Sequence, residues 1–295
     1  MKRNEKSKKF VGVDVGLAAM GQGAPRFAIA ICSLLASVVA DRAMAADWPL
    51  RGSVAPSYMR WDGWQAGVQV GYGNLNTDFG DSTGPLVAFI LRNSTLENEA
   101  QPSSWTTLPR NSTNGPVFGG FVGYNVQWSE LVLGADLAYM HPSVLQSNVG
   151  DSLTRVVTTS DNVQHTVTIS AQSNFKLVDY ATLRARAGYA FDQFLPYAAV
   201  GLAVGRFNYG TTVTVTDNQL LPPNPPGTPS FFQQSASAGQ NNVFAAGVAA
   251  ALGLDWAVTP SVFLRGEWQF IAWSPVNQTR SNVQTGQLGV GVRFW

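Results

Sequence analysis

Few side chains in this sequence could carry out nucleophilic, acid–base or metal chemistry. The chain of 295 residues has two histidines, His141 and His165, and one cysteine, Cys32. An imidazole can act as a general base or bind a metal or haem, but catalysis needs a second group that orients it. Both histidines fall in segments that we interpret as loops, and neither has flanking metal ligands. The sequence therefore predicts no enzymatic activity, no cofactor and no metal site.

A second set of reactive groups is charged and occupies alternate positions of otherwise apolar segments. It consists of Asp136, Arg184, Arg186, Asp255, Arg265, Glu267 and Arg293. Such groups could form a catalytic or proton-relay cluster if they met. Charges inside a protein must be paired, however, and a narrow interior is filled by side chains. We therefore predict a structural charge network in an interior lumen.

The segments that carry these charges alternate with period two, most clearly from Gly286 to Trp295. This segment reads GQLGVGVRFW and places Leu288, Val290, Val292 and Phe294 on one face of an extended strand. Such alternation indicates a strand with two different environments. Barrels of the bacterial outer membrane end on such a strand, which closes the wall against the first strand. Val290, Val292, Phe294 and Trp295 are the expected signal for the barrel assembly machinery.

Seven further segments alternate in the same way, which gives eight strands in total. They are Trp64–Tyr72, Pro116–Trp128, Leu131–Met140, about Lys176–Phe191, Leu195–Asn208, Val243–Trp256 and Val262–Trp273. An even number of antiparallel strands, each about 9–11 residues long, is typical of a transmembrane barrel. The predicted fold class is therefore all-β: an eight-stranded antiparallel up-and-down transmembrane β-barrel with long extracellular loops and short periplasmic turns.

The connections between these strands alternate between long and short. The long ones are 74–115, 141–175 and 209–242. Within the second, Arg155 to Thr159 and Val163 to Ile169 are rich in threonine and valine and could extend strands beyond the membrane. The third contains four prolines between Pro222 and Pro226, which forbid a regular ladder there. Both ends of the barrel are then expected on the periplasmic side.

Residues 1–45 have the features of a cleaved export signal. A basic start precedes the apolar core from Phe27 to Val39, and the small residues Ala43 and Ala45 place cleavage between Ala45 and Ala46. Met20 is an alternative start. The predicted organisation is a signal peptide at 1–45, a periplasmic lead-in at 46–60 and a barrel at 61–295. No disulfide or metal thiolate is expected, because Cys32 lies in the signal.

Composition supports this organisation. Charged residues make up 13% of the chain and mean hydropathy is +0.01, so the chain lacks both the charged surface of most soluble domains and a long apolar run. Residues 1–45 hold 7 of the 19 basic and 3 of the 18 acidic residues. The remaining 12 and 15 leave a net charge near −3, so no nucleic-acid partner is expected.

Alternation alone does not separate a membrane barrel from a soluble lipocalin-like barrel with its faces reversed. Three features favour the membrane barrel. The polar face is rich in glycine, as a narrow interior requires. The charged strand residues concentrate on that face, and the apolar face carries aromatic residues towards the strand ends, as at a bilayer interface.

Several short motifs resemble a known family. They are Ala45-Ala46-Asp47, Trp61-Asp62-Gly63-Trp64, Arg184-Ala185-Arg186-Ala187-Gly188-Tyr189, Leu195-Pro196-Tyr197, Leu264-Arg265-Gly266-Glu267-Trp268 and the closing Arg293-Phe294. Over about residues 45–295 the chain is similar to the outer-membrane immunogenic, or porin-family, surface antigens of alphaproteobacteria. That resemblance implies an eight-stranded barrel exposed at the surface, sometimes linked to haemin binding or host contact, with no agreed enzymatic activity. Members usually end on phenylalanine, whereas this chain ends on Trp295.

The expected function is that of an integral outer-membrane barrel of a Gram-negative bacterium, with a structural and surface-interaction role and a lumen packed with side chains. The expected partners are outer-membrane lipid, lipopolysaccharide and the barrel assembly machinery; a loop ligand stays unknown. A narrow channel and a haemin-binding surface protein are the alternatives. A lipid-modifying enzyme is a further one, because His141-Pro142-Ser143 is similar to the His-x-Ser motif of an outer-membrane lipid A deacylase, although the asparagine that follows that motif is absent and Asp151 is the nearest later acid.

Overall fold

The computed structural model describes residues 59–105, 108–220 and 230–294. The chain divides into two units, Met1–Leu50 and Arg51–Trp295, and every described residue belongs to the second. The predicted signal peptide, its cleavage site and the lead-in up to residue 58 lie outside the described residues. None of the helices in the described part is long and apolar enough to span a membrane.

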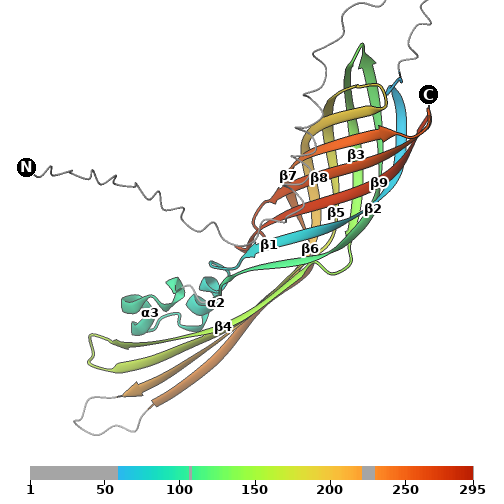
Figure 1. Ribbon diagram of the computed structural model, residues 1–295. Helices are drawn as coiled ribbons and strands as arrows, with labels where there is room; N and C mark the ends of the chain where they lie inside the picture. Colours follow the sequence, from blue (N-terminus) through green and yellow to red (C-terminus); the bar gives the residue numbers. More distant parts are fainter. Residues whose placement is uncertain (1–58, 106–107, 221–229, 295) are drawn as a thin grey trace, which may run out of the picture. The chain divides into compact units, whose positions relative to one another are not determined.

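Nine antiparallel strands make up most of the described chain (Figure 1). They are β1 Gly63–Asp78, β2 Arg110–Trp128, β3 Leu131–Pro142, β4 Gln146–Thr158, β5 Gln164–Tyr189, β6 Phe194–Leu220, β7 Ser230–Ala257, β8 Val262–Trp273 and β9 Arg280–Phe294. Three short helices, α2 Gly84–Ile90, α3 Thr95–Ala100 and η1 Pro102–Ser104, lie between β1 and β2.

Eight of these strands close into a ring, which confirms the predicted fold class. Strand β1 pairs with β2 on one side and with β9 on the other, and β3 closes the ring by pairing with β5. The ninth strand, β4, pairs with β5 beyond the point where β3 leaves it. Short turns join β2 to β3, β5 to β6 and β7 to β8, whereas the helices and long hairpins lie at the opposite end of the ring.

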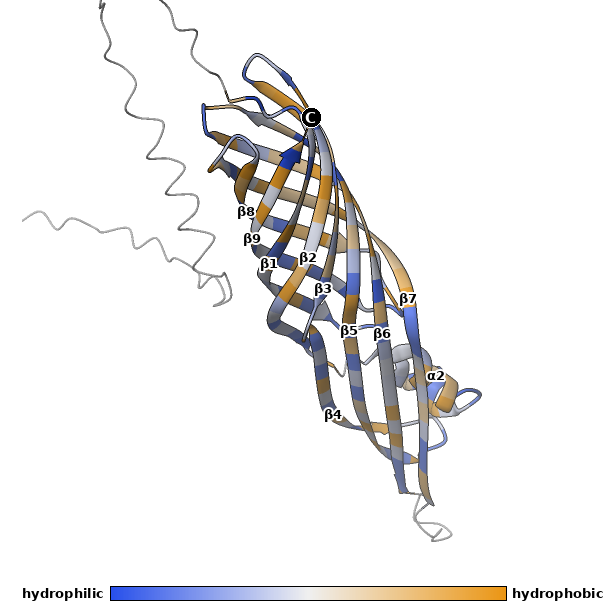
Figure 2. Cartoon of the chain, turned by 90° about the vertical axis from the view of Figure 1, so that its right-hand side faces the viewer, coloured by the Kyte–Doolittle hydropathy of each residue, from blue (hydrophilic) through white to orange (hydrophobic). Residues whose placement is uncertain are grey.

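Apolar side chains cover the outside of the ring, as the alternation predicted. Val68, Leu202 and Leu288 are 68%, 66% and 69% exposed, and hydrophobic and hydrophilic residues alternate along the ring strands (Figure 2). Exposed aromatic residues lie near the strand ends beside the short turns: Trp64, Tyr124, Trp128, Tyr189, Phe194, Trp256 and Phe294. A soluble barrel would bury its apolar face, so this arrangement is that of a wall in contact with lipid.

The structure corrects the predicted boundaries at the far end of the ring. The predicted connections 74–115 and 209–242 contain strand at both ends: β1 continues to Asp78, β2 begins at Arg110, β6 continues to Leu220 and β7 begins at Ser230. The predicted connection 141–175 holds β4 and the first part of β5, which include most of the two segments expected to extend strands. The proline-rich run itself lies within residues 221–229, outside the described part. Together β4 and the outer parts of β5, β6 and β7 form a four-stranded sheet beyond the ring, which we call the extension.

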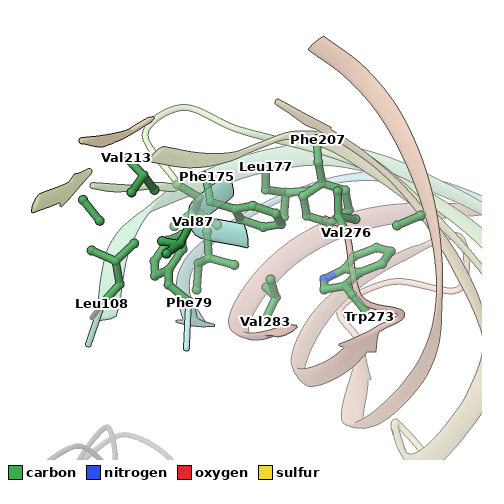
Figure 3. Packing of buried hydrophobic residues seen from close by; sticks show 14 of the residues in the cluster. Phe79, Val87, Leu108, Phe175, Leu177, Phe207, Val213, Trp273, Val276 and Val283 are labelled. Atoms are coloured by element: carbon green, nitrogen blue, oxygen red, sulfur yellow. The ribbon is translucent and has the colours of Figure 1, made fainter. Parts of the chain in front are cut away.

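The apolar face of the extension packs against the helices between β1 and β2. Phe175, Val213 and Val215 from the sheet are buried with Val87 of α2 and Leu96 of α3. The same buried cluster continues into the outer end of the ring, where Phe207 and Trp273 pack with ring centroids 5.2 Å apart (Figure 3). The extension and the ring therefore share one continuous hydrophobic core.

Candidate functional site: the barrel lumen

The centre of the lumen holds six of the seven charged residues that the sequence singled out. They come from four strands: Asp136 from β3, Arg184 and Arg186 from β5, Asp255 from β7, and Arg265 and Glu267 from β8. Each is at most 3% exposed. The ladder places Asp136 directly opposite Arg184 and Asp255 directly opposite Arg265. Period-two alternation therefore sends all six side chains to the same face, and the strand register brings them to similar heights.

Arg184 bridges two carboxylates. Its Nε donates to Asp136 Oδ1 over 2.9 Å and its Nη2 to Asp136 Oδ2 over 3.1 Å. Across the lumen, its Nη1 donates to Glu267 Oε1 over 2.6 Å and its Nη2 to Glu267 Oε2 over 3.1 Å. The hydroxyl of Tyr197 on β6 adds a hydrogen bond to Glu267 Oε2 at 2.6 Å. These contacts tie β3, β5, β6 and β8 together through the middle of the barrel.

Asp255 is the second centre of the network. It accepts hydrogen bonds from Arg265 Nε at 2.8 Å and Nη2 at 3.0 Å, and from Arg186 Nη2 at 2.8 Å. Arg265 Nη1 also lies 3.8 Å from Asp136 Oδ2, which links the two centres. Three arginines thus face three carboxylates, so the buried set is electrically neutral, as burial of charge requires.

Aromatic rings occupy the faces of the guanidinium groups. Arg186 lies over the ring of Tyr197 at 3.9 Å and Arg265 over the ring of Phe121 at 4.0 Å. Among the described residues, Nη1 of each of these two arginines has no hydrogen-bond partner. The attraction between a guanidinium group and a ring face partly compensates for the missing hydrogen bond. Gly253 makes room for this packing, because a Cβ there would lie 2.4 Å from Tyr197 Cζ.

The charge network lies between two apolar layers. Strand β8 passes through all three: Phe263 belongs to one buried cluster, Arg265 and Glu267 follow, and Ile271 and Trp273 belong to another. The layer beside the short turns contains Trp61, Phe121, Val132, Leu195, Ala257 and Phe263. The opposite layer contains Met140, Tyr180, Phe207, Ile271, Trp273 and Val283. Together the layers and the network place buried side chains along the lumen, with buried polar residues such as Gln65, Gln69 and Gln287 beside them.

Arg293, the seventh predicted member, lies apart from this network. Its side chain is buried, but its Nη1 donates to the carbonyl of Arg60 at 2.7 Å and its Nη2 to the carbonyl of Pro260 at 3.0 Å. It also lies over the ring of Trp61 at 4.3 Å. Arg293 is near the end of β9 and thus lies closer to the short turns than the carboxylates of the network do. It therefore joins the chain before β1 to the β7–β8 turn.

Both histidines are on strands rather than in the predicted loops. His141 lies on β3, with its ring centroid 5.3 Å from that of Phe118. His165 lies on β5 in the extension and is buried, with Nδ1 2.7 Å from Asp217 Oδ2 on β6. This pair was not predicted, because it depends on the β5–β6 register, which brings together residues 52 positions apart in the chain. Within the described part of the chain, no group of three or more potential ligands could hold a metal ion.

Comparison with known proteins finds solved structures of similar fold and one matching family model. The chain is similar to Ail, the attachment invasion locus protein of Yersinia pestis, with 10% identity and a TM-score of 0.33 over 79% of this chain and 99% of that one. Neisserial surface protein A is 14% identical, with a TM-score of 0.32 over 78% of this chain and 97% of that one. OprG from Pseudomonas aeruginosa is 9% identical, with a TM-score of 0.32 over 79% of this chain and 97% of that one.

No curated protein matches the sequence. The family model described as "Outer membrane protein beta-barrel domain" matches residues 32–294, and the chain therefore belongs to this family of outer-membrane proteins of Gram-negative bacteria.

Proposed function

We propose that this outer-membrane barrel is closed to ions and solutes and that its role is structural and at the cell surface. The observation that supports a closed barrel is the neutral charge network between two apolar layers. An eight-stranded ring leaves an interior just wide enough for side chains, whereas aqueous porins have about 16 strands or more. With the lumen occupied, the parts of the protein available to partners are the lipid-facing wall and the extension.

Conductance in planar lipid bilayers tests whether the barrel is closed. The purified protein should give no stable openings above the bilayer background, because ions cannot cross the two apolar layers. The variant Phe121→Ala/Phe263→Ala thins one layer and serves as a comparison, and a 16-stranded porin serves as the positive control. Large, long-lived openings of the native barrel would show that it is a channel.

The narrower identity, an alphaproteobacterial outer-membrane surface antigen, belongs to this proposal as well. Its support is the set of short sequence motifs, including Trp61-Asp62-Gly63-Trp64 and the arginine-containing segment of β5. The expected partners are the lipid and lipopolysaccharide around the wall and the barrel assembly machinery. This role involves no enzymatic reaction. Of the two histidines, His165 is held by Asp217 within the extension and His141 packs on Phe118.

Export through the periplasm is the first step of this role. Residues 1–45 are proposed to be the signal peptide and 46–60 the lead-in to the barrel. The protein purified from outer membranes should then begin at Ala46, because small residues occupy the two positions that the cleaving enzyme recognises. Sequencing its amino terminus measures this directly. A mature start upstream of Phe27 would mean that the apolar core is retained and that the assignment is wrong.

A further inference from the structure

The extension is an open sheet with two free edges, formed by β4 and by the outer part of β7. Among the residues that the structure describes, β4 pairs only with β5, and β7 between Ser230 and Gln240 pairs only with β6. Strand β8 joins β7 at Gly247, further along the chain. An unpaired edge presents a row of free backbone N–H and C=O groups, to which another strand can bond.

The β4 edge carries the features that prevent such pairing. Two charged side chains, Asp151 and Arg155, lie on the strand, and charges on an edge discourage a further strand. The Asn111 side chain donates to the carbonyl of Asn148 at 3.4 Å. At the following turn, Glu99 of α3 accepts from the backbone N–H of Ser160 at 2.8 Å and from its hydroxyl at 2.5 Å. This edge is therefore protected by charge and by neighbouring segments.

The β7 edge has none of these features. Residues 230–242 read SFFQQSASAGQNN, without a charged residue or a proline, and all are exposed or half-buried. Helix α2 lies near β6 and β7, but within the described chain no backbone hydrogen bond other than those of the β6 ladder reaches residues 230–241. The one irregularity, a register shift after Gln240, lies at the base of the extension. The edge from Phe231 to Gln240 is therefore available for pairing.

We propose that the β7 edge binds the same edge of a second copy of this protein, strand against antiparallel strand. One open and one protected edge allow a closed pair related by a two-fold axis, whereas two open edges would allow an endless chain. An uncharged edge also meets its own copy without repulsion between like charges. On the face away from the helices, Ser235, Ser237 and Gly239 are small, so identical backbones can approach closely.

The direction of β7 relative to the membrane determines where the second copy can lie. Strand β7 runs without interruption from the extension into the ring, so in every copy it runs from outside towards the membrane. Two copies in one membrane therefore run in the same direction. Antiparallel pairing needs opposite directions and thus joins copies from two membranes that face each other. The paired edges act as a contact between cells.

Clustering of vesicles tests this contact. Purified protein is inserted into two populations of lipid vesicles with different dyes, and clusters that contain both dyes are counted. The native protein should cluster them, and the variant Ser235→Lys/Ser237→Lys should reduce clustering at least tenfold, because four lysines would meet across the pair. The matched control is Ser170→Lys/Gln172→Lys, on the same face of β5 and away from both edges, which should cluster like the native protein.

Cysteine cross-linking then identifies the edge. The proposed mature chain, from Ala46, contains no cysteine. Single cysteines introduced at Gln233, Ser235, Ser237 or Gly239 should therefore give disulfide dimers between vesicles, strongest at the one position nearest the two-fold axis. Equal clustering by the β7 variant and the native protein, or dimers only between copies within one vesicle, would overturn the proposal. Neither result bears on conductance, so the closed barrel and the edge contact stand or fall separately.

Discussion

At the scale of single residues, the lumen shows how a small barrel buries charge. The guanidinium group of Arg184 forms ion pairs with both Asp136 and Glu267. It therefore keeps one anionic partner if the other is removed. Such a pair adds little net stability relative to apolar residues of the same volume, but removal of one partner is costly. We therefore expect the network to matter through the cost of breaking it rather than through its net stability.

Replacement of Asp136 measures this cost. Asp136→Ala leaves Arg184 with Glu267 but removes two of its hydrogen bonds and the nearby contact of Arg265. We expect the free energy of unfolding to fall by about 3 kcal/mol, the lower end for a broken buried pair, because one carboxylate remains. Urea unfolding of the barrel in lipid vesicles gives this value.

The control for that measurement is Asp151→Ala on the exposed strand β4. Asp151 is exposed and accepts a hydrogen bond from the adjacent backbone N–H of Ser152 at 2.7 Å. Its replacement should change stability by about 0.5 kcal/mol or less, as substitutions at exposed positions usually do. If both variants unfolded at the same urea concentration, the Asp136 carboxylate would not stabilise the lumen, and its pairing with Arg184 would have no energetic role.

At the scale of elements, the sequence predicted the strands inside the membrane but only two short parts of those outside, Arg155–Thr159 and Val163–Ile169, which lie almost entirely on β4 and β5. In the ring, lipid on one side and a narrow lumen on the other impose strong alternation, and the seven charges were predicted from that pattern alone. Six of them meet in the network, whereas Arg293 lies apart from it. In the extension, water replaces lipid, so threonine, serine and glutamine take the place of leucine and valine on the outer face. The two-residue alternation remains, as in Thr212-Val213-Thr214-Val215 of β6, but the two faces of the strand differ little in hydropathy.

The helices between β1 and β2 were also missed, although one of them has a recognisable start. The hydroxyl of Ser94 accepts from the backbone N–H of Glu97 at 3.1 Å, and Glu97 follows Ser94 by three residues. This is the spacing of a capping box, which the sequence could have revealed. Helix α2 has no such side-chain cap; seven residues are too few to show a helical period, and burial of Val87 and Ile90 against the extension holds it in place.

At the scale of the whole molecule, the barrel depends on one seam between its first and last strands. Strands β1 and β9 pair from Trp64 opposite Phe294 to Asp78 opposite Arg280. Phe294 is 50% exposed on the lipid side, in line with Val290 and Val292. Trp295 lies outside the described residues. If strand β9 continued regularly, Trp295 would have the parity of the lumen, since each residue changes face.

Truncation of the chain separates the two terminal aromatic residues. Deletion of Trp295 alone should leave the amount of barrel in the outer membrane nearly unchanged, because the chain then ends on the lipid-facing Phe294 and the seam is intact. Deletion of both residues should lower that amount severalfold, because the proposed assembly signal loses its last lipid-facing side chain and Trp64 loses its partner. Blots of outer-membrane fractions from cells that make each variant at equal levels compare them. Equal loss from the two deletions would mean that the terminal position matters more than the face, and the assignment of Phe294 to the signal would be wrong.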